Sequence, residues 1–221
     1  MGKISILTKE QKTLLDVITK NPYFSSRFYF TGGTALSECY LHHRFSDDLD
    51  FFSEKEIDQQ VILSLITKWG KQYGFRIESR FVEVVYRFHF SFAEGKNYMV
   101  DFAYYPYQPI EKSTKKYGQM NINSLRDIAT NKLFTINQRT DAKDFVDLFF
   151  LLRNHYSLWD LVYSIEAKFK NTDFDLLLLA QDLLKVDDFT ALPRMIKPLS
   201  LEVLKKFFHK KALELGKTRV E

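Results

Sequence analysis

Apolar and polar positions follow two different periods along this chain. Residues 8–20 carry apolar side chains at helical spacing, and 34–43 and 58–73 also have the pattern of helices. Runs rich in aromatic and β-branched residues predict strands at 28–30, 49–52, 75–81, 84–92 and 98–104. From residue 124 onward the pattern is helical throughout, beginning with helices at 124–138 and 139–152.

These elements divide the chain into a mixed first half and a helical second half. The turn at 94–97, Glu-Gly-Lys-Asn, predicts a hairpin between the strands on either side of it, and 110–121 has the pattern of an exposed connector. We therefore predict an α+β fold. A small mixed sheet with helices would occupy residues 1–115 and pack against a C-terminal helical lobe in residues 116–221.

Composition narrows the class of protein. The chain has 221 residues, of which 45% are hydrophobic and 16% aromatic, so it can bury a core and is not disordered. Its formal net charge of +4 permits RNA or DNA binding without requiring it. A single cysteine, Cys39, excludes an intramolecular disulfide and a cysteine-cluster metal site, and fits a reducing cytoplasm. The first 18 residues contain no apolar run long enough for a signal peptide or a membrane span.

The most informative segment is TGGTALSECYLHHRFSDDLDFF, residues 31–52. Gly32 and Gly33 let a backbone approach a bulky ligand, and they open a predicted helix whose N-terminus favours anions. Asp48 and Asp50 lie two positions apart in an apolar strand, so both carboxylates point to the same face. Two such carboxylates repel each other unless a cation lies between them. A carboxylate pair for a metal and a turn for phosphate together suggest chemistry on a nucleotide.

A third carboxylate, Asp101, interrupts the predicted strand at 98–104, where aspartate is disfavoured. If this strand lies beside the one that carries Asp48 and Asp50, three carboxylates converge. Such a donor set suits Mg²⁺ or Mn²⁺, with substrate phosphates completing the coordination shell. The alternative is that Asp101 faces the surface or forms a salt bridge with a nearby lysine or arginine.

Arg44 and Ser46 lie in the loop just before the acidic strand. A guanidinium at this place could hold a triphosphate through paired hydrogen bonds. The alternative is that Arg44 neutralises Asp47 or Asp48 and that Ser46 only caps a turn.

In the helical half, Lys132 falls within the apolar stripe of 124–138. A lysine there either snorkels to water or meets an anion, such as the carboxylates or the nucleotide phosphates across the lobe interface. In 139–152, Asp144 lies at the edge of the apolar stripe and could face that interface. Asp147 lies off the stripe, where a solvated helix face is the usual explanation.

These motifs resemble a known family. GGTAL at 32–36 and HRFSDDLDFF at 43–52, with VDF at 100–102, resemble the nucleotidyltransferase superfamily that includes polymerase β. The finer similarity is to the AbiEii/AbiGii toxin family of nucleotidyltransferase-like proteins, and it extends roughly over residues 25–153. A second, shorter motif of that family is matched by Lys132, Arg139, Lys143 and Asp144.

The resemblance implies a nucleotidyltransferase fold with a helical lobe and a set of site residues. The metal ligands would be Asp48 and Asp50, with Asp101 as the third candidate. The triphosphate site would be formed by Gly32, Gly33, Thr34, Arg44, Ser46 and Lys132. The catalytic residues would be Asp48, Asp50, Lys132 and Asp144. In this assignment Lys132 contacts phosphates, and Asp144 aids the acceptor or the metal.

Family members are toxins of toxin–antitoxin pairs, and some add nucleotides to the 3′ end of tRNA. Their antitoxins are separate proteins, often with a winged-helix DNA-binding domain. The leading hypothesis is therefore a toxin of a type IV-like system that uses Mg²⁺ or Mn²⁺ to transfer a nucleotide from a nucleoside triphosphate to RNA, with tRNA preferred. Two alternatives stay open: transfer to a hydroxyl of a protein or of a small molecule such as an antibiotic, and a non-catalytic regulatory binding module.

Overall fold

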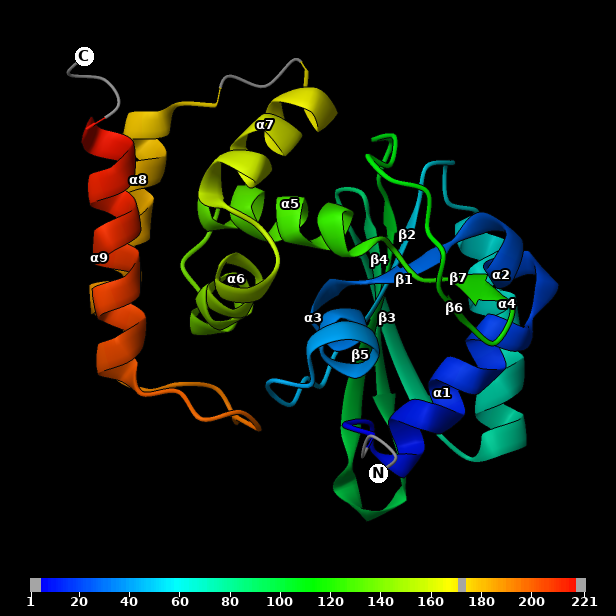
Figure 1. Cartoon of the computed structure of the whole chain (residues 1–221). Helices are drawn as coiled ribbons and strands as arrows, with labels where there is room; N and C mark the ends of the chain where they lie inside the picture. Colours follow the sequence, from blue (N-terminus) through cyan, green and yellow to red (C-terminus); the bar gives the residue numbers. More distant parts are fainter. Residues whose placement is uncertain (1–4, 171–173, 218–221) are drawn as a thin grey trace. The chain divides into compact units, whose positions relative to one another are not determined.

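A computed structural model describes residues 5–170 and 174–217, which form two compact units (Figure 1). Unit 1 takes in the described residues up to 38 together with 46–108 and 113–123. Unit 2 takes in 39–45, 109–112 and the described residues from 124 onward. Both units are therefore discontinuous in sequence, and the predicted boundary at 115/116 falls inside the last segment of unit 1.

Unit 1 is built on a five-stranded mixed sheet with the spatial order β1-β2-β5-β4-β3. Its strands are β1 (Tyr29–Thr31), β2 (Leu49–Ser53), β3 (Arg76–Val82), β4 (Val85–Ser91) and β5 (Asn97–Tyr104). β2 and β5 run parallel, whereas the other neighbouring strands are antiparallel. The predicted α+β class, with its small mixed sheet and the hairpin between β4 and β5, is confirmed.

Four helices accompany this sheet: α1 (Lys9–Lys20), α2 (Pro22–Arg27), α3 (Gly32–Leu36) and α4 (Gln59–Tyr73). Thr8 caps α1 and Asp58 caps α4 by accepting hydrogen bonds from backbone N–H groups, so both predicted helices, at 8–20 and 58–73, are present. The short helix α2 was not predicted. The helix predicted at 34–43 begins earlier, as α3, and continues as a π-helical turn (Ser37–Leu41).

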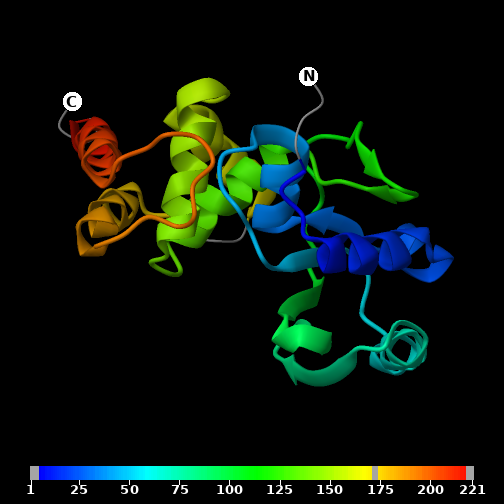
Figure 2. The same ribbon diagram turned by 90° about the horizontal axis from the view of Figure 1, so that it is seen from below.

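One face of the sheet is packed with aromatic rings. Phe51 of β2 stacks on Phe102 of β5 with 5.3 Å between ring centroids, and Phe24 of α2 lies 5.0 Å from Phe102. Trp69 of α4 lies 5.4 Å from Phe24 and extends the cluster. Figure 1 shows α1, α2 and α4 gathered on one side of the strands, and Figure 2 shows α4 nearly end-on beside them. Phe51 and Phe102 point to this face, so Asp50 and Asp101, each one position earlier on its strand, point to the other.

The segment predicted as an exposed connector contains a short ribbon. Its strands are β6 (Lys116–Tyr117) and β7 (Met120–Asn121), joined by a turn in which Gly118 has a φ of 57°. Met120 and Ile122 are buried, and Ile122 forms an isolated bridge with Phe30 of β1. The segment is exposed or partly exposed as predicted, except at Met120. The two strands within it were not predicted, because strands of two residues carry no periodicity that a sequence could display.

Unit 2 contains the helices α5 (Leu125–Ile136), α6 (Ala142–Asn154), α7 (Leu158–Lys168), α8 (Leu176–Leu184) and α9 (Leu201–Lys217). The helical character predicted for the second half is confirmed. α8 and α9 lie side by side in both views (Figures 1 and 2). No helix in the described ranges is both long enough and apolar enough to cross a membrane.

A buried carboxylate fixes the segment 109–112 within unit 2. Asp127 of α5 accepts hydrogen bonds from the backbone N–H groups of Ile110 and Glu111, at 3.0 and 3.2 Å. Lys168 of α7 donates to the same carboxylate at 2.7 Å, and both side chains are almost fully buried. Burial alone would raise the pKa of Asp127, but the bonds from Lys168 and Ser124 lower it overall. The carboxylate is therefore ionised and joins three parts of the unit.

Candidate active site

The acidic motif lies on and just before β2 in unit 1. Leu49 and Phe51 are fully buried, whereas Asp50 between them is only partly buried. This alternation matches the prediction that the carboxylate and the apolar side chains point to opposite faces. In register, Asp50 is level with Thr31 of β1 and with Asp101 of β5. The strand that carries Asp101 is therefore the direct neighbour of the strand that carries Asp50.

Gly32 lies directly against the carboxylate of Asp50. A Cβ atom built on Gly32 would stand 1.9 Å from Asp50 Oδ2, and the residue has a φ of +73°. Both features require glycine, since a side chain would overlap the carboxylate and a positive φ is unfavourable for other residues. The Gly-Gly turn was predicted to let a backbone approach a ligand. The group that it approaches in the structure is the Asp50 carboxylate.

Gly32→Ala should separate these two requirements. We expect the positive φ to cost about 1–2 kcal/mol of unfolding free energy and the overlap with Asp50 to cost a further 1–3 kcal/mol or so. Gly74→Ala is the matched control, because Gly74 has a φ of +71° and a Cβ atom there would meet nothing within 4 Å. Urea unfolding of both variants measures the difference. Equal losses would mean that the Asp50 contact is easily relieved.

Two buried polar side chains hold the loop before β2. Thr34 Oγ1 of α3 donates to the carbonyl oxygen of Asp48. Gln11 Nε2 of α1 donates to the carbonyl oxygens of Ser46 and Asp47, at 3.0 and 2.9 Å. Thr34 and Ser46 are buried, so the hydroxyl of Thr34 is occupied with positioning Asp48. Gln11 was missed by the sequence analysis, although a glutamine in the apolar stripe of α1 was a signal.

Asp101 forms an ion pair with Arg87 of β4. Arg87 donates to both carboxylate oxygens, with distances of 2.8 Å from Nε to Oδ1 and 2.5 Å from Nη2 to Oδ2. Within residues 5–170 and 174–217, no group of three or more His, Cys, Asp or Glu side chains is arranged to hold a metal ion. The observed contact is the salt bridge that the sequence left open as an alternative. A metal-ligand role for Asp101 stays a prediction, and the metal would compete with Arg87 for this carboxylate.

Asp48 and Asp50 nevertheless fit a divalent cation. Carboxylate oxygens are the donors that Mg²⁺ prefers, and Mg²⁺ is commonly held by one or two carboxylates together with substrate phosphates and water. Because Gly32 has no Cβ atom, the Asp50 carboxylate can lie against its backbone, in space that a Cβ atom would occupy. The donor set of these two residues is therefore suitable for Mg²⁺ or Mn²⁺.

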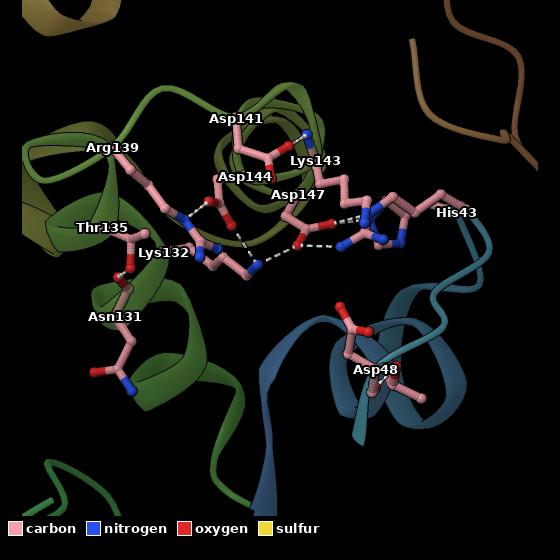
Figure 3. Close-up of polar contacts among 12 residues, drawn as sticks. His43, Asp48, Asn131, Lys132, Thr135, Arg139, Asp141, Lys143, Asp144 and Asp147 are labelled. Atoms are coloured by element: carbon pink, nitrogen blue, oxygen red, sulfur yellow. Dashed lines mark hydrogen bonds and ion pairs between the residues drawn. The ribbon is translucent and has the colours of Figure 1, made fainter. Parts of the chain in front are cut away.

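The second set of predicted site residues meets in unit 2, around Asp147 of α6 (Figure 3). Asp147 accepts from Arg44 Nε and Nη2 at 2.6 and 2.8 Å, and its Oδ1 lies 2.7 Å from His43 Nε2. Lys132 Nζ lies 2.6 Å from Asp147 Oδ2. Asp147 is fully buried, so the prediction of a solvated position was wrong. The reason is that α6 is buried at every position from 144 to 152 and has no solvated face there.

Lys132 of α5 also contacts Asp144 of α6. Its Nζ lies 2.6 Å from Asp144 Oδ1, and Arg139 Nε donates to Asp144 Oδ2 at 2.8 Å. Of the two alternatives for Lys132, the structure shows an anion partner: two carboxylates one helical turn apart. Asp144 and Lys132 are thus direct partners within unit 2, a pairing that the sequence analysis did not predict.

The two carboxylates of the cluster, Lys132 and Arg44 are ionised despite their burial. Burial by itself would raise the pKa of Asp147, but Lys132 and Arg44 hold that pKa well below its usual range. Burial would likewise lower the pKa of Lys132, yet Asp147 and Asp144 raise it overall. Each charge therefore depends on its partners, which is typical of functional sites and of buried ion-pair networks alike.

Arg44 is not accessible to a ligand in this structure. Its side chain is almost fully buried, and Nη1 donates to its neighbour's carbonyl oxygen, Phe45 O, while the other nitrogens bind Asp147. Neither Asp47 nor Asp48 is its partner among the contacts described. Contact between Arg44 and a triphosphate stays a prediction.

His43 should make the stability of the protein depend on pH. Burial lowers the pKa of His43 below its usual value near 6.5, although the hydrogen bond with Asp147 opposes this shift. The unfolded chain then binds a proton at a higher pH than the folded one. The contribution is fully present above about pH 6.5 and is lost as the pH falls toward the folded pKa.

We therefore expect the unfolding free energy to fall between about pH 7 and pH 5, before most carboxylates titrate. Urea unfolding across this range measures the slope. His43→Gln should remove most of it, whereas His155→Gln should remove less, because burial and Lys197 also lower the pKa of His155 but its side chain is largely exposed. A slope unchanged by His43→Gln would contradict this assignment.

Comparison with known proteins agrees with this architecture. The family described as "Nucleotidyl transferase AbiEii toxin, Type IV TA system" matches residues 14–216. An uncharacterized protein of Aquifex aeolicus (strain VF5) is 33% identical over 177 residues, covering 77% of this chain and 80% of that protein.

Two solved structures have a similar fold. The nucleotidyltransferase toxin MenT4 from Mycobacterium tuberculosis H37Rv gives a TM-score of 0.60 at 14% identity, covering 93% of this chain and 82% of that chain. A putative nucleotidyltransferase from H. pylori gives 0.55 at 23% identity, covering 95% and 99%. The family match extends over most of the sequence. The chain therefore belongs to the AbiEii family of nucleotidyltransferase toxins of type IV toxin–antitoxin systems.

Proposed function

We propose that this nucleotidyltransferase requires a divalent metal and transfers a nucleotide from a nucleoside triphosphate to RNA, with tRNA as the preferred acceptor. The observation that carries the proposal is the pair Asp48 and Asp50, with Gly32 pressed against the second carboxylate. This arrangement suits a metal that binds phosphate, and the mildly basic chain suits a polyanionic acceptor.

In unit 1, Asp48 and Asp50 would hold Mg²⁺ or Mn²⁺. The bound ion would act as a Lewis acid that stabilises negative charge on the phosphoryl oxygens. Thr34 and Gln11 hold the backbone of the loop that carries Asp48 through its carbonyl oxygens. Gly32 and Gly33 would present backbone N–H groups to the triphosphate.

In unit 2, Lys132 would donate a hydrogen bond to a phosphate. An ammonium group has three N–H donors, and two of them are directed at Asp144 and Asp147, which leaves one for an anion. Asp147 holds Lys132 and Arg44 in place and joins the proposed site residues as a positioning residue. Asp144 would accept from, or orient, the acceptor hydroxyl or the metal's ligands.

The reaction is the displacement of pyrophosphate by a hydroxyl. The acceptor oxygen forms a bond with the α-phosphorus while the bond from this phosphorus to the bridging oxygen of the β-phosphate breaks. The hydroxyl proton passes to a base, and the electron pair of the broken bond leaves with pyrophosphate. The protein's share of the catalysis is positioning and electrostatic stabilisation rather than covalent chemistry.

The test is transfer of label from each of the four nucleoside triphosphates to total tRNA in the presence of Mg²⁺. The Asp48→Ala/Asp50→Ala variant is the inactive control, and Asp47→Ala is the matched control, since Asp47 is exposed and outside the proposed site. Label on tRNA that disappears only in the double variant supports the proposal and identifies the preferred base.

Label on protein, or on a small hydroxyl compound, in place of RNA would overturn the proposed acceptor while keeping the enzyme class. Nucleotide transfer that persists after removal of divalent cations with a chelator would overturn the metal requirement. RNA binding that weakens steeply as salt rises would agree with an RNA acceptor.

Membership of a toxin family implies an antitoxin partner as well as a nucleotide substrate. We propose that this partner is a separate protein and that both act in the cytoplasm, on the strength of the family resemblance and of the single cysteine. Induced expression should arrest bacterial growth, and Asp50→Asn should abolish the arrest. Arrest by the Asp50→Asn variant would mean that toxicity does not depend on transfer.

A further inference from the structure

A row of polar residues crosses the acid-bearing face of the sheet in unit 1. The strand registers place Asp50 of β2 level with Asp101 of β5, Asp101 level with Arg87 of β4, and Arg87 level with Arg80 of β3. Residues that are level on adjacent strands point to the same face. Asp50, the candidate metal ligand, and Arg87 thus lie on one face of the sheet, with Asp101 between them.

The contact between Asp101 and Arg87 engages both oxygens of the carboxylate. The Asp101 side chain is 11% exposed and the Arg87 side chain 31% exposed, so the pair is partly screened from water. Bidentate arginine–carboxylate pairs are among the stronger side-chain hydrogen bonds. Each oxygen of this carboxylate already accepts one charge-assisted hydrogen bond, so a metal at Asp101 would compete with Arg87 for it.

Arg87 keeps capacity for a second anion. A guanidinium has five N–H donors, and Asp101 receives two of them, which leaves three. A guanidinium is protonated at any pH at which the protein is folded, so the charge of Arg87 is permanent. Arg87 is level with Asp101, which is level with Asp50, so a ligand of a metal at Asp50 would lie over the same face of the sheet as Arg87.

We propose that Asp101 is a positioning residue that holds Arg87, and that Arg87 donates to a phosphate of the nucleotide whose metal is bound by Asp48 and Asp50. Asp101 then lies outside the coordination shell, and the metal takes its protein ligands from two carboxylates. The inference rests on the proposed function, since it requires a nucleotide at this face. It assigns to β4 a phosphate-binding residue that the sequence motifs do not contain.

The first test observes the ion pair directly by NMR of arginine Nε–H groups in the wild-type protein. The Arg87→Lys variant identifies the Arg87 signal, and Arg80 serves as the internal control. A guanidinium held by a carboxylate exchanges its Nε proton slowly with water. We expect the Arg87 signal to persist when Mg²⁺ alone is added and to shift when a nucleoside triphosphate follows, while the Arg80 signal is unchanged at both steps.

Loss of the slowly exchanging Arg87 signal on addition of Mg²⁺ alone would overturn the inference, because it would mean that Asp101 leaves Arg87 for the metal. A persistent signal that the nucleotide does not shift would overturn the phosphate contact.

The second test measures nucleotide affinity by calorimetry in the presence of Mg²⁺. Arg87→Ala should weaken binding about ten- to a hundredfold, the range for loss of a hydrogen bond to a charged group. Arg80→Ala removes the same charge from the same row, one strand farther away, and should weaken binding less than about twofold. Arg87→Lys keeps the charge but lacks the paired N–H donors of a guanidinium, so its loss of affinity should lie between those of Arg87→Ala and Arg80→Ala.

The outcomes separate the inference from the proposed function. Wild-type affinity in Arg87→Ala would overturn the inference alone. Absence of nucleotide binding by the wild-type protein would overturn the proposed function together with the phosphate contact that depends on it.

Discussion

Asp50→Asn should reduce nucleotide transfer at least about a hundred- to a thousandfold while the fold persists. The substitution removes one of two carboxylates that would hold the metal, and an amide is a much weaker ligand for Mg²⁺. It also removes a negative charge that lies level with Asp101 on the neighbouring strand. The free energy of unfolding should therefore stay within about 1 kcal/mol of the wild-type value, or rise slightly.

The measurement pairs initial rates of transfer with urea unfolding. Asp47→Asn is the matched control, since it makes the same chemical change at an exposed position in the same loop. It should leave both quantities nearly unchanged. A large loss of stability in Asp50→Asn would contradict the prediction, because loss of transfer would then reflect unfolding and not loss of a ligand.

Asp147→Asn should lower the free energy of unfolding by about 3–5 kcal/mol. The substitution would leave the buried Arg44 and Lys132 without a shared carboxylate, and an unpaired charge in the interior is far more costly than a pair. Lys132 would keep Asp144, so the cluster would be weakened and not abolished. Transfer should fall as well, because Lys132 loses one of the two groups that orient it.

Urea unfolding at constant pH measures this effect. Asp16→Asn provides the comparison: it removes a carboxylate that pairs with Lys20 at 3.3 Å on the exposed side of α1. That pair is screened by water and should contribute little. A similarly small change for both variants would contradict the view that the buried network stabilises unit 2.

The sheet and the acidic strand were predictable because their signals are local. Alternation of apolar and polar residues around Asp50 defines both a strand and its two faces within a few positions. Residues 94–97 form a turn whose composition is specific enough to predict the pairing of β4 with β5. The caps at Thr8 and Asp58 are similarly local. In each case the residues that determine the element lie within a few positions of one another in the sequence.

Asp147 could not be placed from the sequence, because its burial depends on distant partners. The period of α6 assigns Asp147 to the side away from the main apolar stripe, which usually faces water. Its partners His43 and Arg44 lie more than a hundred positions earlier. A helix buried on all sides carries its polar residues inward, and only the tertiary structure shows which cations receive them.

The pairing of Asp101 with Arg87 was also beyond the sequence analysis. The sequence indicated an aspartate in a strand interior and thus a need for a partner, with a metal or a basic residue as alternatives. The choice depends on strand register, since Arg87 reaches Asp101 only because the two residues are level on β4 and β5. A shift by one residue would turn Arg87 to the aromatic face.

The contact between Gly32 and Asp50 limits which substitutions this site can tolerate. The backbone of Gly32 occupies the space beside the carboxylate so closely that any side chain there collides with it. A glutamate at position 50 keeps the charge but carries one more methylene, and the same backbone denies its carboxylate the place that the aspartate occupies. A side chain at position 32 therefore requires a change at position 50 as well, whereas position 50 can change alone only to a side chain no longer than aspartate.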